Sequence, residues 1–180
     1  MKDNKFDAVK CCGEMGYITY LASIDGVKVD TWEGSSELEA AYLLEKFTKE
    51  ELKIYYALRY VPQLMVNSDQ NAEYVLNDLL QKGGNIEVEF KINSPPYTVK
   101  ELNLWLSKKH GNPISWKDFQ VFEETITLDG LNQLVEIRKA VNELRDKAGA
   151  EKLNKYVSEG NRVIMIVGKD HFRSIMDSIP

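Results

Sequence analysis

The sequence predicts an α+β fold, because the strand-like and helical runs of its 180 residues do not alternate strictly enough for a doubly wound sheet. Asp25-Gly26 joins two β-rich stretches, several segments have helical spacing, and residues 163–167 are wholly apolar. An Asp-Gly pair favours a tight hairpin, in which both turn positions need positive φ. A short run without polar alternation is typical of a strand covered on both faces. We therefore expect one domain over 1–180, with about six helices packed on a sheet.

The N-terminus is expected to form a three-stranded antiparallel meander. Its strands would be 5–12, 17–24 and 27–32, which are rich in β-branched and aromatic residues. Three more strands are expected near 86–92, 121–127 and 162–167. Residues 86–92 alternate apolar and charged side chains, as in a strand with one wet face. Residues 115–124 fit a helix or a strand equally well.

Helix starts are marked by Ser or Thr followed three residues later by an acid, the spacing of a capping box. The pattern occurs at Ser36, Thr48 and Thr98. The expected helices begin at Ser36, run from Thr48 to a stop at Pro62, and cover 69–82, 98–110, 130–148, 150–158 and 171–178. Pro95-Pro96 breaks the chain, so a weak domain boundary is expected near 93–97.

Composition excludes several classes of function. The net charge is −5 and the charges are dispersed, whereas nucleic-acid binding needs a basic face. The only cysteines are the neighbours Cys11 and Cys12, which predicts no disulfide framework. No apolar stretch approaches the roughly 18 residues of a membrane span, and the N-terminus does not resemble a signal peptide. We expect an acidic cytoplasmic protein with no bound cofactor or zinc site.

Three ionisable residues follow the apolar run: Lys169, Asp170 and His171. The end of a buried strand is a common place for a site, so His171 could act as a general base while Lys169 holds an anion. The alternative is structural, with Asp170 capping the last helix and the other two solvated.

A second candidate site is Glu89-Phe90-Lys91, which has the E-x-K spacing of the PD-(D/E)xK nuclease pattern. In that pattern the carboxylate helps to hold Mg²⁺ and the lysine steadies the attacking water. The alternative function is therefore a metal-dependent nuclease or phosphoesterase using Glu87, Glu89 and Lys91, with Asp170 and His171 as further candidates. The upstream aspartate of the pattern is missing, since Asp78 lies inside an expected helix. Charged strand faces also occur simply to prevent association.

Aromatic residues suggest a third kind of site. Tyr56, Tyr60 and Trp116 are of the types enriched where proteins meet partners, although a ring-rich core would also explain them. No catalytic motif stands out. We therefore expect a non-catalytic, cytoplasmic protein-binding module, such as an inhibitor, immunity or anti-defence protein of a bacterium or mobile element. The alternatives are the nuclease and a regulatory domain that binds a small ligand.

Overall fold

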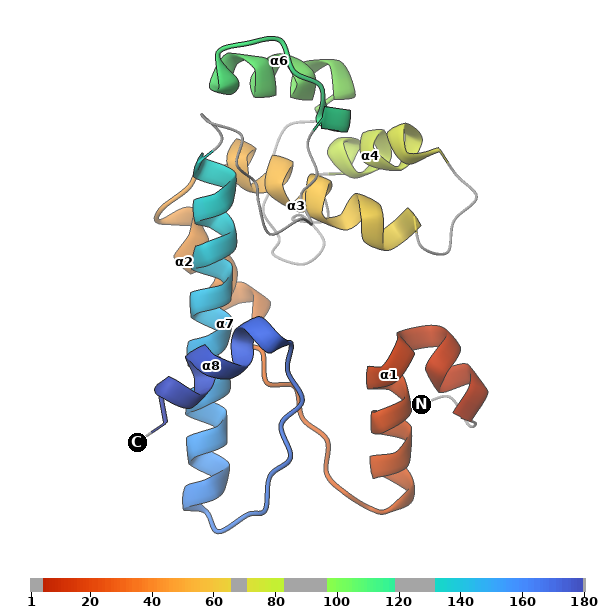
Figure 1. Ribbon diagram of the computed structural model, residues 1–180, viewed down its shortest axis with the longest axis vertical. Coiled ribbons are helices and arrows are strands. Elements are labelled where there is room, and N and C mark those ends of the chain that lie inside the picture. Colours follow the sequence, from red (N-terminus) through yellow and green to blue (C-terminus); the bar gives the residue numbers. More distant parts are fainter. Residues whose placement is uncertain (1–4, 66–70, 83–96, 119–131, 180) are drawn as a thin grey trace. The chain divides into compact units, whose positions relative to one another are not determined.

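A computed structural model describes residues 5–65, 71–82, 97–118 and 132–179, and every regular element in these ranges is helical (Figure 1). The α+β prediction is therefore wrong for the described part of the chain, which contains no strand. The predicted strands 86–92 and 121–127 lie outside the described residues, as does 93–96 of the expected boundary. In chain order the elements are α1 (Lys5–Ile24), α2 (Ser36–Leu44), α3 (Lys49–Met65), α4 (Ala72–Gln81), α6 (Val99–His110), the 3₁₀ turn η1 (Trp116–Asp118), α7 (Asn132–Ser158) and α8 (Lys169–Asp177).

The predicted N-terminal meander is replaced by α1, which spans both of its first two strands. Hydroxyl groups that favoured a strand are accommodated in the helix: Thr19 Oγ1 donates to the Met15 carbonyl at 2.9 Å, one turn back. Gly26 does adopt positive φ, at +67°, but it ends the helix and makes no hairpin. The Val27 amide donates to the Ala22 carbonyl at 2.8 Å, as in a Schellman motif.

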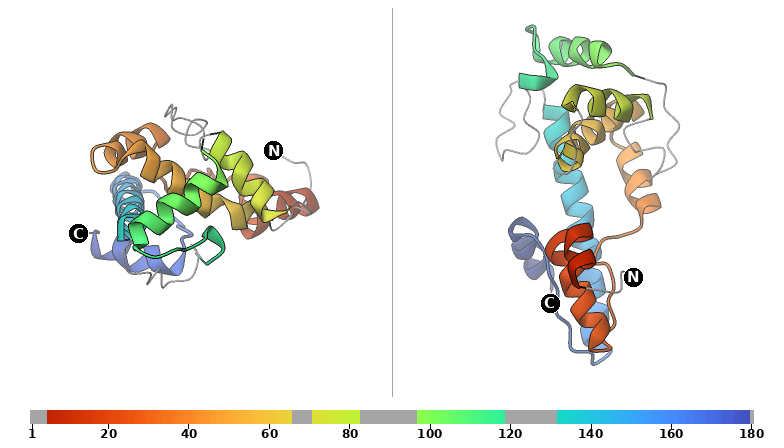
Figure 2. Two further views of the ribbon diagram at one scale, coloured as in Figure 1. Left: turned by 90° about the horizontal axis from the view of Figure 1, so that it is seen from above. Right: turned by 90° about the vertical axis from the view of Figure 1, so that its right-hand side faces the viewer.

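The chain divides into two compact units, residues 1–32 and 33–180. The second unit holds the hydrophobic core. In it α3 packs against both α4 and α7, α2 packs on α7, and α4 contacts α6 (Figure 2). The side chains of α3 that fill this core are completely or almost completely buried: Leu52, Ile54, Tyr55, Tyr56, Ala57 and Leu58. Burial on nearly all sides of this central stretch is typical of a helix inside a core, while exposed polar residues such as Lys49 and Glu50 lie at the N-terminal end of α3.

Two of the three predicted capping boxes are present. Thr48 and Glu51 bond reciprocally, as do Thr98 and Glu101. At α2 the N-cap is Ser35 instead of Ser36, since Ser35 Oγ accepts from the Leu38 amide at 3.2 Å. Helix α3 also continues past Pro62 to Met65, so the predicted stop at Pro62 is wrong.

The C-terminal part of the chain contains two helices joined by an extended segment. The expected break between 148 and 150 is absent, and α7 is continuous over 27 residues. Gly160 ends it with φ +79°, and the Asn161 amide donates to the Tyr156 carbonyl at 3.0 Å. Residues 161–168 are extended but pair with no strand in the described residues, which corrects the prediction of a central strand at 162–167. Helix α8 then packs against α7.

Candidate functional site

The predicted site at the end of the apolar run is built differently from the expectation. Helix α8 begins at Lys169, with Gly168 as its N-cap, so Asp170 is not the capping residue and lies within the first turn. Lys169 is exposed and His171 is partly covered. With no sheet in the described residues, the three residues stand at a helix N-terminus and not at the edge of a central strand.

His171 has a partner that the sequence did not suggest. Its Nδ1 donates to Oδ1 of Asp146 on α7 at 2.6 Å. Asp146 is only 6% exposed, and a buried carboxylate is stable only when it is paired or hydrogen-bonded. The pair therefore fastens α8 to α7. A base oriented by a carboxylate supplies two of the three members of a hydrolytic triad.

A second buried polar cluster joins α2, α3 and α7. Glu39 accepts from the Tyr56 hydroxyl at 2.6 Å and from Arg145 Nε at 3.1 Å, while Arg145 Nη1 donates to Glu33 at 3.0 Å. Burial and the Glu39 carboxylate raise the pKa of Tyr56, so its phenol stays protonated. Burial lowers the pKa of Arg145, but Glu39 and Glu33 outweigh this and raise it overall. All four side chains are engaged with one another, and the cluster acts as a structural joint.

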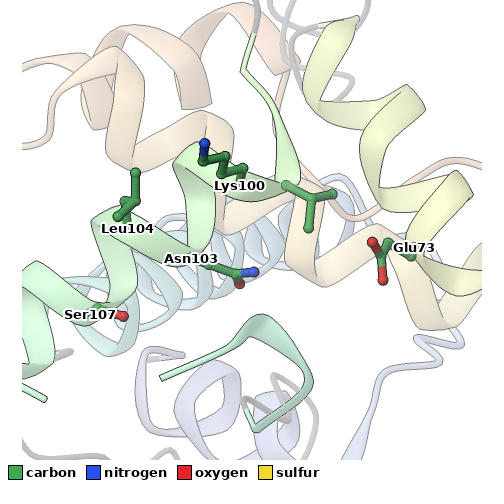
Figure 3. A pocket seen from close by; sticks show the side chains of 6 residues that line it. Glu73, Lys100, Asn103, Leu104 and Ser107 are labelled. Carbon is green, nitrogen blue, oxygen red and sulfur yellow. The ribbon is translucent and has the colours of Figure 1, made fainter. Parts of the chain in front are cut away.

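The α6 surface carries an open depression of about 360 Å³ (Figure 3). Glu73 of α4 lies at one end of it and Ser107 of α6 at the other. Two of its polar side chains already hold the following segment: Asn103 accepts from the Trp116 amide at 2.8 Å, and Ser107 both donates to and accepts from the Ile114 backbone. The depression therefore lacks the convergent acids and bases of a catalytic cleft.

The remaining predicted site residues are scattered. Tyr56 is 1% exposed and its ring stacks on Tyr60 with centroids 6.1 Å apart, so Tyr56 offers no surface to a partner. Trp116 is half-buried against the core, and Lys117 lies over its ring. Glu87, Glu89 and Lys91 lie outside the described residues, so the nuclease hypothesis stays a prediction. Within the described ranges no three His, Cys, Asp or Glu residues are grouped to hold a metal ion.

The least expected feature is the apolar run itself. Residues 163–167, here called the apolar segment, form no regular element (Figure 1), and their side chains range from half-buried at Met165 and Val167 to exposed at Ile164. Ile164 is 91% exposed, the highest value among the large hydrophobic residues that are exposed in the described part of the chain. On the adjoining α8, Phe172 and Met176 are also exposed and are four residues apart, so they share one stripe of the helix. A strongly exposed aliphatic side chain with other exposed apolar side chains beside it is typical of an interaction surface.

Comparison with known proteins adds no relative. No protein-family model matches the chain, and no curated protein or solved structure matches it either. None of the described helices combines the length and the apolar character that a bilayer-spanning helix requires.

Proposed function

We propose that this chain is a non-catalytic, cytoplasmic protein that binds another protein chain through its apolar segment, as an inhibitor or immunity protein would. The observation that carries the proposal is the exposure of Ile164, at 91%, inside a run of five apolar residues. Leaving a large aliphatic side chain in water forgoes about 1.5–3 kcal/mol of burial energy. A partner chain that covers the segment recovers that energy on binding.

The polar clusters support the same proposal. Asp146 and His171 fasten α8 to α7, and Glu39, Tyr56 and Arg145 join α2, α3 and α7. These ionisable groups bond to one another across helix contacts, whereas a catalytic group must face a substrate. The described residues therefore favour a binding surface over a reaction centre.

A capture experiment with matched variants tests the proposal. The immobilised chain is incubated with lysate of the cells that produce it, beside the Ile164→Lys variant and the control Leu38→Lys. Leu38 is 67% exposed on α2, so both variants place a lysine on an already exposed position and leave folding intact. We expect a protein that wild type and Leu38→Lys retain and Ile164→Lys loses. If all three retain the same set of proteins, including added copies of the chain, the apolar segment is not a binding surface.

A further inference from the structure

The backbone of the apolar segment is unpaired within the part of the chain that the structure describes. No backbone hydrogen bond joins residues 162–167 to another described residue. Its composition has the signature of a strand, since Val163, Ile164, Ile166 and Val167 are β-branched. The segment thus combines an extended backbone, high β-propensity and free amides and carbonyls, which are the properties of an open sheet edge.

These backbone groups restrict what can cover the segment. A docking helix would bury the side chains of the segment but would leave the amides and carbonyls of the segment without protein partners. The backbone groups of a helix already bond within that helix. Only another extended strand satisfies both the side chains and the backbone. The occupant is therefore a β-strand.

We propose that this strand is the same segment of a second copy of the chain, paired antiparallel about Met165. This inference rests on the proposed function and names its partner. A two-fold pairing centred on Met165 places Val163 opposite Val167 and Ile164 opposite Ile166, so all five positions meet apolar residues. An interface of this kind is self-complementary, and the partner strand is present wherever the protein is.

The flanking charges agree with this register. Arg162 comes to lie opposite Gly168, and Lys169 opposite Asn161, so no two like charges face each other directly. In this antiparallel arrangement the N-terminal flank of one segment, which contains Glu159, lies beside the C-terminal flank of the other, where α8 begins with Lys169. A shift of two residues in either direction would place one basic residue opposite an apolar side chain: Arg162 opposite Ile166, or Lys169 opposite Val163.

The first test measures self-association of the full-length chain. Sedimentation velocity over a series of concentrations should give a monomer–dimer equilibrium for wild type and for Leu38→Lys. Ile164→Lys places one charge in each of the two paired strands, and should weaken dimerisation about tenfold or more. Met165→Pro removes a backbone donor at the axis and should have a similar effect, while helix content by circular dichroism stays unchanged.

The second test reads the register. In a background with Cys11 and Cys12 replaced by serine, Met165→Cys places two thiols across the axis, with Cα atoms about 4.5–5.5 Å apart, within disulfide range. Oxidised glutathione, which takes up the two electrons, should cross-link Met165→Cys into a dimer much faster than Leu38→Cys. Equal rates, or a wild-type monomer at every concentration, overturn the inference. If the monomer still captures a different protein that Ile164→Lys loses, the proposed function survives and only the identity of the partner is wrong.

Discussion

His171 on α8 donates a 2.6 Å hydrogen bond to Asp146 on α7, and this contact joins two helices whose intervening chain is extended and unpaired. Asp146 is buried, so its carboxylate depends on this partner in place of water. The pair therefore helps to hold α8 on α7, together with the buried Ile175 of α8.

Replacing His171 by alanine should destabilise the protein by about 2 kcal/mol, because the buried Asp146 carboxylate loses the hydrogen bond that offsets its desolvation. Urea unfolding at neutral pH measures the change. Arg173→Ala, on the same helix and exposed, is the matched control and should change the free energy of unfolding by less than about 0.5 kcal/mol. Equal effects from both variants would show that the pair adds nothing to the docking of α8.

Replacing Arg145 by methionine should cost about 2–3 kcal/mol, because Glu39 remains buried with only the Tyr56 hydroxyl as a partner. Lys139→Met on the same helix removes a solvent-exposed pair with Glu136 and should cost less than about 1 kcal/mol. Urea unfolding of both variants gives the comparison. Combining Arg145→Met with Glu39→Gln should restore part of the loss, since the second change removes the unpaired charge.

The capping box of α3 predicts a dependence on acid. Burial raises the pKa of Glu51, but hydrogen bonds from Thr48 and the charge of Lys109 lower it overall, below the ordinary 4.5. A lowered folded-state pKa means that the stabilisation is present above pH 4.5 and is lost as pH falls through the folded-state value. Thr48→Ala should therefore cost about 1 kcal/mol at neutral pH and progressively less in acid. Lys49→Ala, the next residue, is the control, and a cost that does not change with pH would contradict the role of Glu51.

The buried phenols predict a dependence on alkali. Burial raises the pKa of Tyr55 and of Tyr56, and the carboxylate of Glu39 adds to the effect at Tyr56. Because the raised pKa belongs to the folded state, the stabilisation is complete below pH 10 and is lost as pH rises above it. Ultraviolet titration should show phenols that ionise only above their ordinary range, and Tyr56→Phe should remove one of them. If all nine tyrosines ionise together near pH 10 in the folded chain, this account fails.

Local signals in the sequence predicted the helices better than they predicted the fold class. The capping boxes at Thr48 and Thr98 are present because reciprocal bonding of side chains needs only neighbouring residues. Gly26 was expected to take positive φ and does so, but a hairpin turn and a helix C-terminus require the same glycine. The strand predicted at 162–167 is absent from the described residues, because a strand needs a neighbour to pair with, and that neighbour depends on the rest of the chain.

The candidate site was predicted only in part. His171 was singled out, but Asp146 was missed because it lies in the sequence between Arg145 and Lys147, like any solvated charge. A signal was present: Asp146 precedes the buried Ala150 by four residues, so a carboxylate shares the inner face of α7. Glu39 has the capping-box spacing after Ser36, although it bonds across the core to Tyr56, 17 positions away, and to Arg145, 106 positions away. Such distant partners leave no local pattern.

Gly160 controls how the apolar segment is displayed. Its φ of +79° turns the chain out of α7, and a Cβ at this position would meet no atom within 4 Å. Any other residue would be disfavoured by the backbone alone, by about 1–2 kcal/mol, without a steric clash. Replacement by alanine would favour extension of α7 through Asn161 and Arg162. The residues that follow could then become helical, and their amides would form hydrogen bonds within the helix. One achiral residue thus acts as the stop that keeps residues 163–167 outside the helix, which the proposed pairing requires.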